Sequence, residues 1–318
     1  MRSASQIEHF VTLFDSSYLP MGMALHDSLM THGQPFRLWI ICMDETIEEQ
    51  LSRLALNYVM LIPLREVETA ELLAVKTCRS RREYCWTLTP FSFQAVFDRD
   101  PGVERVTYLD ADLFFFSSPM VLLHELDEFG KHVLITEHAY APIHAKRWLK
   151  RSGRFCVQFL SVRRTAEADT VMRWWQERCL EWCFARYEEE KFGDQKYLDQ
   201  WPELFGDKIH IILQKDKTLA PWNVKYYELM QNRRLEPVFF HFHRFRILGP
   251  KKGYLYIRYS IGREGLRLYD AYLTTISNVV NKLIKDNIPI IYTKKTVAML
   301  IIMAWQTLRR RNYSRRIT

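Results

Sequence analysis

The sequence RVTYLDADLFFF, which runs from Arg105 to Phe116, is an apolar β-strand pattern interrupted by Asp110 and Asp112. Side chains two residues apart on a strand point to the same side of a sheet, so we expect both carboxylates to face one way. Two unpaired charges within an apolar strand are costly to bury, so something must compensate them. Because hard divalent cations bind carboxylate and phosphate oxygens, the pair predicts a metal site, with a structural salt bridge as the alternative.

Strand and helix patterns alternate on both sides of this stretch. Helices are expected near Pro20, from a Thr46–Glu49 capping box, near Thr69 and over residues 166–186. The other expected strands are residues 10–14, 37–43, 58–63, 132–136, 155–162, 209–213 and 238–243. This alternation predicts an α/β fold with a mostly parallel sheet covered by helices on both faces. Ligands of such sheets bind at the carboxyl ends of the strands, where Asp15 and Asp44 also lie.

Composition excludes several classes of protein. The chain has 318 residues, of which 48% are hydrophobic and 26% are charged, as in a soluble globular protein and unlike a disordered one. Glycine is scarce, with 11 residues, and neither GxGxxG nor GxxxxGK[ST] occurs. A bound phosphate must therefore be held by a metal or by side chains, because both common glycine-rich phosphate loops are missing.

The basic charge is concentrated at the C-terminal end. The formal net charge is +8, and the last 25 residues carry seven Lys and Arg and no acid, which leaves +1 for the rest. Within them the apolar run 296–308 is shorter than the roughly 20 residues that span a bilayer, but it suits an interfacial helix on anionic lipid. A helix packed on the protein body is the alternative. The residues predicted to bind a membrane are Lys294, Lys295, Trp305, Arg309, Arg310 and Arg311.

The cysteines and the N-terminal sequence indicate the compartment. The six cysteines form no CxxC or CxxH pattern, and we expect Cys179 and Cys183 to be core thiols rather than a zinc pair. The first 15 residues lack the apolar segment of a secretory signal. We therefore expect a cytoplasmic protein, bound peripherally to the inner face of the cytoplasmic membrane.

Residues 86–119, from WTLTP to SSP, resemble the GT-A nucleotide-sugar transferases, specifically glycosyltransferase family 8 and its bacterial relatives. The shared pattern is Trp-x-Leu-Thr, a helix and Tyr-Leu-Asp-Ala-Asp. Two more segments match in order, Gly-Asp-Gln at 193–195 and a Pro-Trp-Asn corner at 221–223 before a histidine-containing strand. The resemblance covers about residues 8–250. It implies a GT-A, Rossmann-like domain over residues 1–250, followed by a C-terminal helical region over residues 251–318.

The resemblance also implies a donor-binding site. Asp15 and Tyr18 correspond to the base-binding segment, with Tyr18 suited to stacking on a uracil-type ring, and a buried aromatic is the alternative. Arg79 and Arg82 lie where relatives supply a cation to the diphosphate, which guanidinium groups bind bidentately. A solvated basic patch is the alternative for both arginines. Ala111, between the two aspartates, completes the implied nucleotide-sugar site.

The family uses a histidine near the end of this region as a third metal ligand. His241 and His243 are two apart in FFHFHRFR and would share a face of a strand. We prefer His243, nearer the end of the expected strand, with His241 as the alternative, and imidazole suits Mn²⁺ better than Mg²⁺. The family usually has a His-x-x-Gly-x-x-Lys-Pro-Trp segment here, but in this chain Pro221–Trp222 lies upstream of the histidines. This departure leaves the stereochemical outcome open.

The remaining implied site residues lie on the side of the sugar and the acceptor. Asp194 and Gln195 would face the anomeric carbon and stabilise the positive charge that develops there. The alternative for Asp194 is an ordinary helix N-cap. The implied acceptor contacts are Trp222, Asn223, Glu137 and His138.

We therefore predict a glycosyltransferase that depends on Mn²⁺ or Mg²⁺. It would transfer a sugar from a nucleoside-diphosphate sugar, of UDP type and with retention favoured, to a saccharide or lipid-linked acceptor in surface polysaccharide or lipopolysaccharide assembly. One alternative is a nucleotidyltransferase acting on sugar phosphates, whose Gly-rich loop the segment DSSYLPMG does not match. Another is a non-catalytic nucleotide-sugar-binding protein at a membrane. No nucleic-acid partner is expected.

Overall fold

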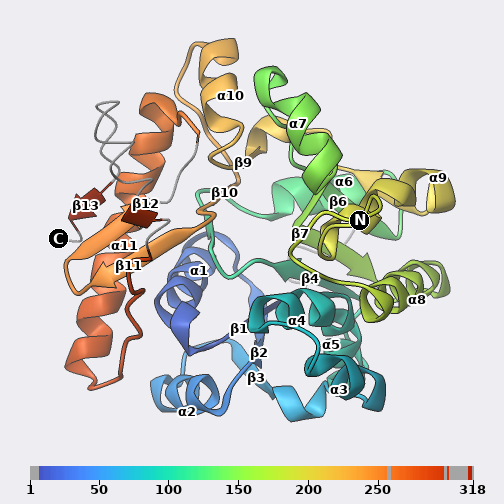
Figure 1. Ribbon diagram of the computed structural model, residues 1–318, viewed down its shortest axis with the longest axis horizontal. Coiled ribbons are helices and arrows are strands. Elements are labelled where there is room, and N and C mark those ends of the chain that lie inside the picture. Colours follow the sequence, from blue (N-terminus) through green and yellow to red (C-terminus); the bar gives the residue numbers. More distant parts are fainter. Residues whose placement is uncertain (1–6, 256–258, 297–298, 301–313, 317–318) are drawn as a thin grey trace.

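The structure, a computed structural model, describes residues 7–255, 259–296, 299–300 and 314–316. Its centre is a seven-stranded sheet in which only β7 runs antiparallel to its neighbours (Figure 1). In spatial order the strands are β3 (Val59–Pro63), β2 (Phe36–Cys42), β1 (Glu8–Phe14), β4 (Arg105–Leu109), β7 (Phe155–Arg163), β6 (Val133–Glu137) and β8 (Ile209–Ile211). The predicted mostly parallel α/β sheet is therefore confirmed.

Helices cover both faces of the sheet because alternate strand residues enter two different cores. In β2, Trp39 and Ile41 face one core, while Leu38 and Ile40 face the other. The first core is covered by α3 (Ala70–Lys76), α4 (Arg81–Leu88), α5 (Ser92–Arg99), α8 (Ala166–Glu181) and α9 (Trp201–Phe205). The second is covered by α1 (Leu19–His32), α2 (Glu45–Leu54), α6 (Met120–Glu128) and α11 (Gly262–Lys285). Cys179 and Cys183 are free thiols buried in the first core, as expected.

Two small sheets extend this body. The first contains β5 (Leu113–Phe115), β10 (Phe239–His241) and β9 (Thr218–Leu219), with β10 in the middle. The second contains β11 (Phe245–Gly249), β12 (Lys252–Leu255) and β13 (Ser314–Arg316). The predicted boundary at residue 250 falls in the turn between β11 and β12, and α11 packs against α1.

Some predicted boundaries were wrong for local reasons. The helix predicted from a Thr46 capping box begins at Glu45, because the Asp44 carboxylate accepts the Ile47 N–H and is the N-cap. The helix predicted over residues 166–186 ends at Glu181, where Trp182 adopts an extended conformation. The stretch 105–116 is not one strand, since Asp110, Ala111 and Asp112 form a turn between β4 and β5.

Candidate active site

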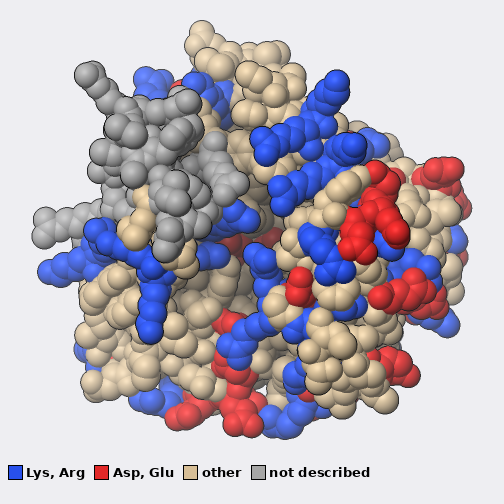
Figure 2. Space-filling model, viewed as in Figure 1, with Lys and Arg blue, Asp and Glu red and all other residues tan. Residues whose placement is uncertain are grey.

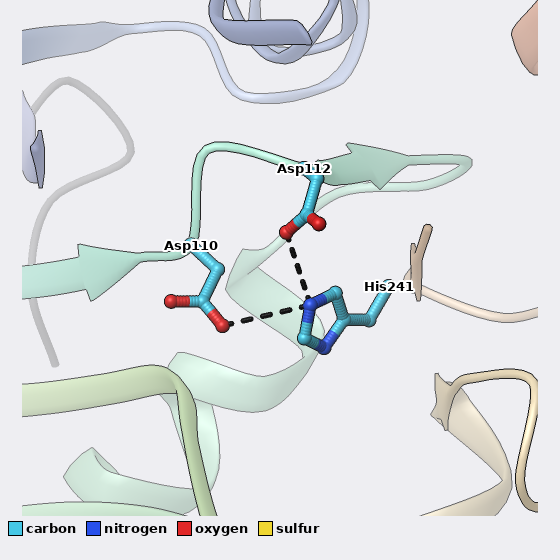
Figure 3. A group of neighbouring side chains, drawn as sticks. All are labelled: Asp110, Asp112 and His241. Atoms are coloured by element: carbon cyan, nitrogen blue, oxygen red, sulfur yellow. Dashed lines mark ion pairs between the residues drawn. The ribbon is translucent and has the colours of Figure 1, made fainter. Parts of the chain in front are cut away.

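The two aspartates meet a histidine at the carboxyl end of β4. Their carboxylates converge from a turn, closed by a 3.0 Å hydrogen bond from the Leu113 N–H to the Asp110 carbonyl, and not from the single strand that we expected. His241 ends β10 and pairs with Leu113 of β5, which brings its ring beside Asp112. The His241 Nε2 atom is 3.0 Å from the Asp112 carboxylate and 3.6 Å from that of Asp110 (Figure 3). One ligand atom from each residue lies within 4.8 Å of the others.

His241, and not the preferred His243, is therefore the histidine of this group. His241 and His243 do not share a face of one strand, as was expected, because β10 ends at His241. The Phe242 N–H then donates to the Asp112 carbonyl, and the chain turns, with Arg244 at a positive φ of 61°. His243 is exposed and lies edge-on to the rings of His241 and Trp222.

Residues of β4 and β7 support the group from behind. The Gln158 Oε1 atom lies 2.6 Å from His241 Nδ1, and because an amide oxygen only accepts, Nδ1 carries the hydrogen. The Nε2 atom is thereby directed to the two carboxylates. The Asp110 N–H donates to the Gln158 carbonyl, and the Tyr108 hydroxyl donates to the Asp110 carboxylate at 3.2 Å. Sequence analysis missed Gln158, because no spacing links it to the other residues.

The charges of the group attract a cation. Burial alone would raise the pKa of Asp112, but the charge and hydrogen bond of His241 bring it below its ordinary value. Burial lowers the pKa of His241, yet Asp112 outweighs this effect and holds that pKa well above its ordinary value. A positive charge between the two carboxylates is therefore favoured at this position.

Asp194 is a further buried carboxyl on this side of the sheet. It is 5% exposed and follows Gly193, whose φ of +55° lets the chain pass the Trp86 ring. Burial, followed by the charge of Asp110, raises the pKa of Asp194 to about 8. Asp194 occupies the N-cap position of the short 3-10 helix Gln195–Gln200, but its side chain makes no capping hydrogen bond there. Gln195 donates its amide to the Ser152 carbonyl at 2.7 Å.

The carboxyl ends of β1 and β2 form the side on which a nucleotide was predicted to bind. The Asp15 carboxylate accepts the Ser17 N–H, and Tyr18 lies under the Arg246 guanidinium at 5.5 Å. Arg81, which sequence analysis did not single out, reaches both Asp15 and Asp44 at 3.3 Å. Its position in the first turn of α4, after the Ser80 cap, was the available signal.

The two arginines that were predicted for the diphosphate contact aromatic rings. Arg79 lies 3.9 Å above the Phe184 ring and donates to the Leu180 carbonyl. The Arg82 guanidinium lies 5.1 Å from the Trp86 ring and is exposed. Arg81, between them in sequence, is the arginine that points to the ends of β1 and β2.

The predicted acceptor residues lie at the end of β6 and after β9. Glu137 is paired with Arg154 and Lys215. Burial lowers the pKa of His138 to about 3, so its imidazole, stacked on Tyr140, is neutral. The Trp222 ring lies edge-on to that of His241, with centroids 5.5 Å apart.

Asn223 has a different position from the other predicted acceptor residues. It is 1% exposed, and its amide bonds the backbone of Thr218, Ala220 and His138. Its side chain thus fixes the corner that carries Trp222.

Around these residues the surface is hollowed. Figure 2 shows a depression near the centre of the face, with acidic side chains visible inside it and basic side chains around it. Ala111, in the turn between the aspartates, is buried.

The predicted membrane tail lies mostly outside the described residues. Lys294 and Lys295 are described and exposed, whereas Trp305, Arg309, Arg310 and Arg311 are not among the described residues. Among the helices that the structure describes, none has the length and apolar character needed to cross a bilayer.

Solved structures with this architecture are glycosyltransferases. The galactosyltransferase LgtC, in complex with donor and acceptor sugar analogues, matches with a TM-score of 0.53 and 11% identity over 91% of this chain and 98% of LgtC. The apo glycosyltransferase GlyE of Streptococcus pneumoniae TIGR4 matches with a TM-score of 0.51 and 15% identity over 91% of this chain and 66% of GlyE. The bifunctional glycosyltransferase WbbM matches with a TM-score of 0.52 and 13% identity over 89% of this chain and 52% of WbbM. The chain therefore has the GT-A glycosyltransferase fold.

Comparison of sequences identifies relatives with higher identity than these solved structures. No protein-family model matches the chain. It is 33% identical to the uncharacterized protein YfnF of Bacillus subtilis (strain 168) over 219 residues, which are 67% of this chain and 71% of YfnF. The chain therefore belongs to the family of YfnF. It is also 28% identical to the uncharacterized protein YfnD of the same organism over 285 residues, 86% of this chain and 90% of YfnD.

Proposed function

We propose that this protein is a metal-dependent glycosyltransferase that transfers a sugar from a nucleoside-diphosphate sugar, of UDP type, to a saccharide or lipid-linked acceptor. The observation that carries the proposal is the convergence of Asp110, Asp112 and His241 at the carboxyl edge of a GT-A sheet. The solved structures that share this fold are glycosyltransferases. The chain has no glycine-rich phosphate loop, so the diphosphate needs another positive partner.

The donor atoms of the group fit Mn²⁺ or Mg²⁺. Two carboxylates and one imidazole form a mostly oxygen set, and the imidazole favours Mn²⁺. The raised pKa of His241 shows that this position already favours a positive charge. When bound, the ion would neutralise charge on the donor diphosphate, both in the ground state and as it leaves.

The chain's own residues supply the remaining roles. To Asp194, a buried carboxyl group near Asp110, we assign the stabilisation of the positive charge that would develop on the anomeric carbon. Gln195 is held by the Ser152 carbonyl and orients this segment. Asp15 and Tyr18 would bind the nucleoside, with Arg81 free to exchange its carboxylate partners for phosphate oxygens.

On the acceptor side we assign Glu137, His138 and Trp222 to sugar contacts, since Glu137 and His138 follow one another at the end of β6 and Trp222 contacts the rings of His138 and His241. Retention of configuration is favoured by the resemblance to family 8. We assign the reaction to surface polysaccharide assembly on the cytoplasmic side of the membrane. Deleting residues 294–318 should lower the membrane-bound fraction of the protein, and an unchanged fraction would count against the tail as an anchor.

The test is a screen of nucleotide sugars. Donor hydrolysis is measured with Mn²⁺ and with EDTA, and the anomer of the released sugar is read by NMR. In parallel, the melting temperature is measured with each nucleoside diphosphate, with and without Mn²⁺, and we expect stabilisation that requires both. Release of pyrophosphate from a sugar phosphate and a nucleoside triphosphate would instead identify a nucleotidyltransferase. Binding without turnover of any donor would indicate a non-catalytic protein.

A further inference from the structure

Helix α7 (Pro142–Ser152) buries little of its surface against the protein body. Of its 11 residues only Ser152 is buried, and Ile143 is 87% exposed. By contrast, α8 buries five of its 16 residues in the core. The sequence of α7, PIHAKRWLKRS, contains no acid. A helix with so little buried surface gains little stability from tertiary packing, so its exposed composition needs another explanation.

The cations of α7 share its solvent side. Lys146, Arg147, Lys150 and Arg151 have the spacing that gathers side chains on one face of a helix, and all four are exposed. Among the residues that the structure describes, none of the four forms a salt bridge with a carboxylate. In α8, by contrast, Arg173 is paired with Asp169 and Arg178 with Glu181. Figure 2 shows basic side chains gathered where Figure 1 places α7.

Helix α10 (Val224–Gln231) adds exposed apolar side chains nearby. Leu229 is 70% and Met230 is 66% exposed. Tyr259 and Ser260 link the two helices: the Tyr259 ring contacts Trp148 of α7, and the Ser260 hydroxyl accepts from Lys225 of α10 at 3.2 Å. Both helices lie at the upper margin of the molecule in Figure 1.

We propose that α7, together with the last turn of α10, binds the surface of an anionic phospholipid bilayer. Within the described part of the chain the α7 cations form no ion pair, and Arg147 and Arg151 contact the rings of Trp148 and Phe192. Cations of this kind are attracted to acidic headgroups, and Ile143, Leu229 and Met230 supply the apolar side chains that enter the headgroup region. These apolar groups do not fit a nucleic-acid phosphate backbone. The surface is distinct from the C-terminal tail, since it lies within residues 142–152 and 224–231.

This contact would also position the candidate active site. The end of α7 binds the catalytic segment directly, because the Ser152 carbonyl accepts from the Gln195 amide. A bilayer bound to α7 would therefore lie beside the cleft, where a lipid-linked acceptor could reach it. This last point rests on the proposed function, whereas the lipid contact itself does not.

The experiment uses the full-length protein and sedimentation with vesicles of phosphatidylcholine, with and without one-third phosphatidylglycerol. In the test variant the four α7 cations are replaced: Lys146→Gln, Arg147→Gln, Lys150→Gln and Arg151→Gln. The matched control makes the same change in net charge at exposed cations that have carboxylate partners: Arg65→Gln, Arg173→Gln, Arg186→Gln and Lys282→Gln. A cation near an acidic bilayer contributes about fivefold in partitioning, so we expect the α7 variant to lose at least about tenfold. The control should lose much less.

A second variant tests the apolar part. Ile143→Ser with Leu229→Ser and Met230→Ser should bind anionic vesicles several-fold more weakly and keep the salt dependence of the wild type. Equal losses in the α7 variant and the charge-matched control would overturn the proposal, because net charge or the tail would then explain binding. Binding of duplex DNA is measured for the same variants. The proposal would also be overturned if the α7 variant lost DNA binding but still bound anionic vesicles. Hydrolysis of a soluble nucleotide sugar should be unchanged in every variant, which separates this contact from the proposed reaction.

Discussion

The two ends of strand β4 carry two groups of buried charge with opposite properties. At its amino end, Arg105 is bonded to Glu8 at 2.6 Å and to Asp127 at 2.8 Å, and Arg163 also pairs with Asp127. Two acids and two bases balance there. At its carboxyl end, Asp110 and Asp112 share a single histidine, and Asp194 adds a third buried carboxyl group nearby.

The difference separates a structural cluster from a functional one. A buried charge is tolerated when an opposite charge and hydrogen bonds compensate it, as they do around Arg105. The aspartate group has excess negative charge and holds its histidine with a raised pKa. The first group is balanced within the chain, whereas the second has more acids than bases, which supports the metal site that we propose there. The predictions below alter one group and use the other as a reference.

The largest effect is expected from removing both aspartate charges. Asp110→Asn with Asp112→Asn should lower donor hydrolysis by about 10⁴-fold, since loss of one charge-stabilising group at a reacting centre costs about 10²-fold. Hydrolysis within tenfold of the wild type would contradict the assignment.

The next largest effect is on stability at the other end of β4. Arg105→Met removes the buried arginine that pairs with Glu8 and one of the two arginines that pair with Asp127, and should lower the free energy of unfolding by about 3 kcal/mol or more. The control, Arg65→Met, removes an exposed pair and should cost less than about 1 kcal/mol. Urea denaturation measures both. A change in Mn²⁺ affinity of folded Arg105→Met would break the proposed separation of the two groups.

A smaller effect is expected behind the histidine. Gln158→Leu removes the acceptor that orients His241 and should weaken Mn²⁺ binding by about 10- to 100-fold, as is usual for such outer partners. Gln158→Glu keeps an acceptor and should bind Mn²⁺ far better than the leucine variant. The control is Gln176→Leu in α8, which loses a hydrogen bond to the Pro90 carbonyl. Unchanged affinity in Gln158→Leu would remove this residue from the site.

The smallest effect is a pH dependence. Because the pKa of Asp194 is raised to about 8 from an ordinary 3.8, the folded protein binds more protons than the unfolded chain between these values. Its contribution to stability is present below about pH 4 and is lost as the pH rises through 8. In EDTA, Asp194→Asn should gain at least about 1.4 kcal/mol over the wild type by pH 8, the value of one pKa unit. Exposed Asp207→Asn should show no such gain, and a gain that shrinks with rising pH would contradict the buried position of Asp194.

The sequence was sufficient for the features that depend on local pattern. Strands such as β1 and β2 and the pair Asp110 and Asp112 are visible because apolar runs and their interruptions are local. Of the two histidines left open, the structure brings His241 and not the preferred His243 to the aspartates, because this depends on where β10 ends, and that is set by pairing with the distant β5. Arg81 and Gln158 were missed because their partners belong to other elements. Asp15 is over 60 residues from Arg81 in the sequence, and His241 is over 80 residues from Gln158.

The central claim is tested most directly by measuring Mn²⁺ binding by electron paramagnetic resonance with a nucleoside diphosphate present. The wild type and folded Arg105→Met should bind the ion alike, and the Asp110→Asn, Asp112→Asn double variant should lose it. Equal binding by the double variant, or no binding by the wild type, would contradict a metal site at the carboxyl end of β4.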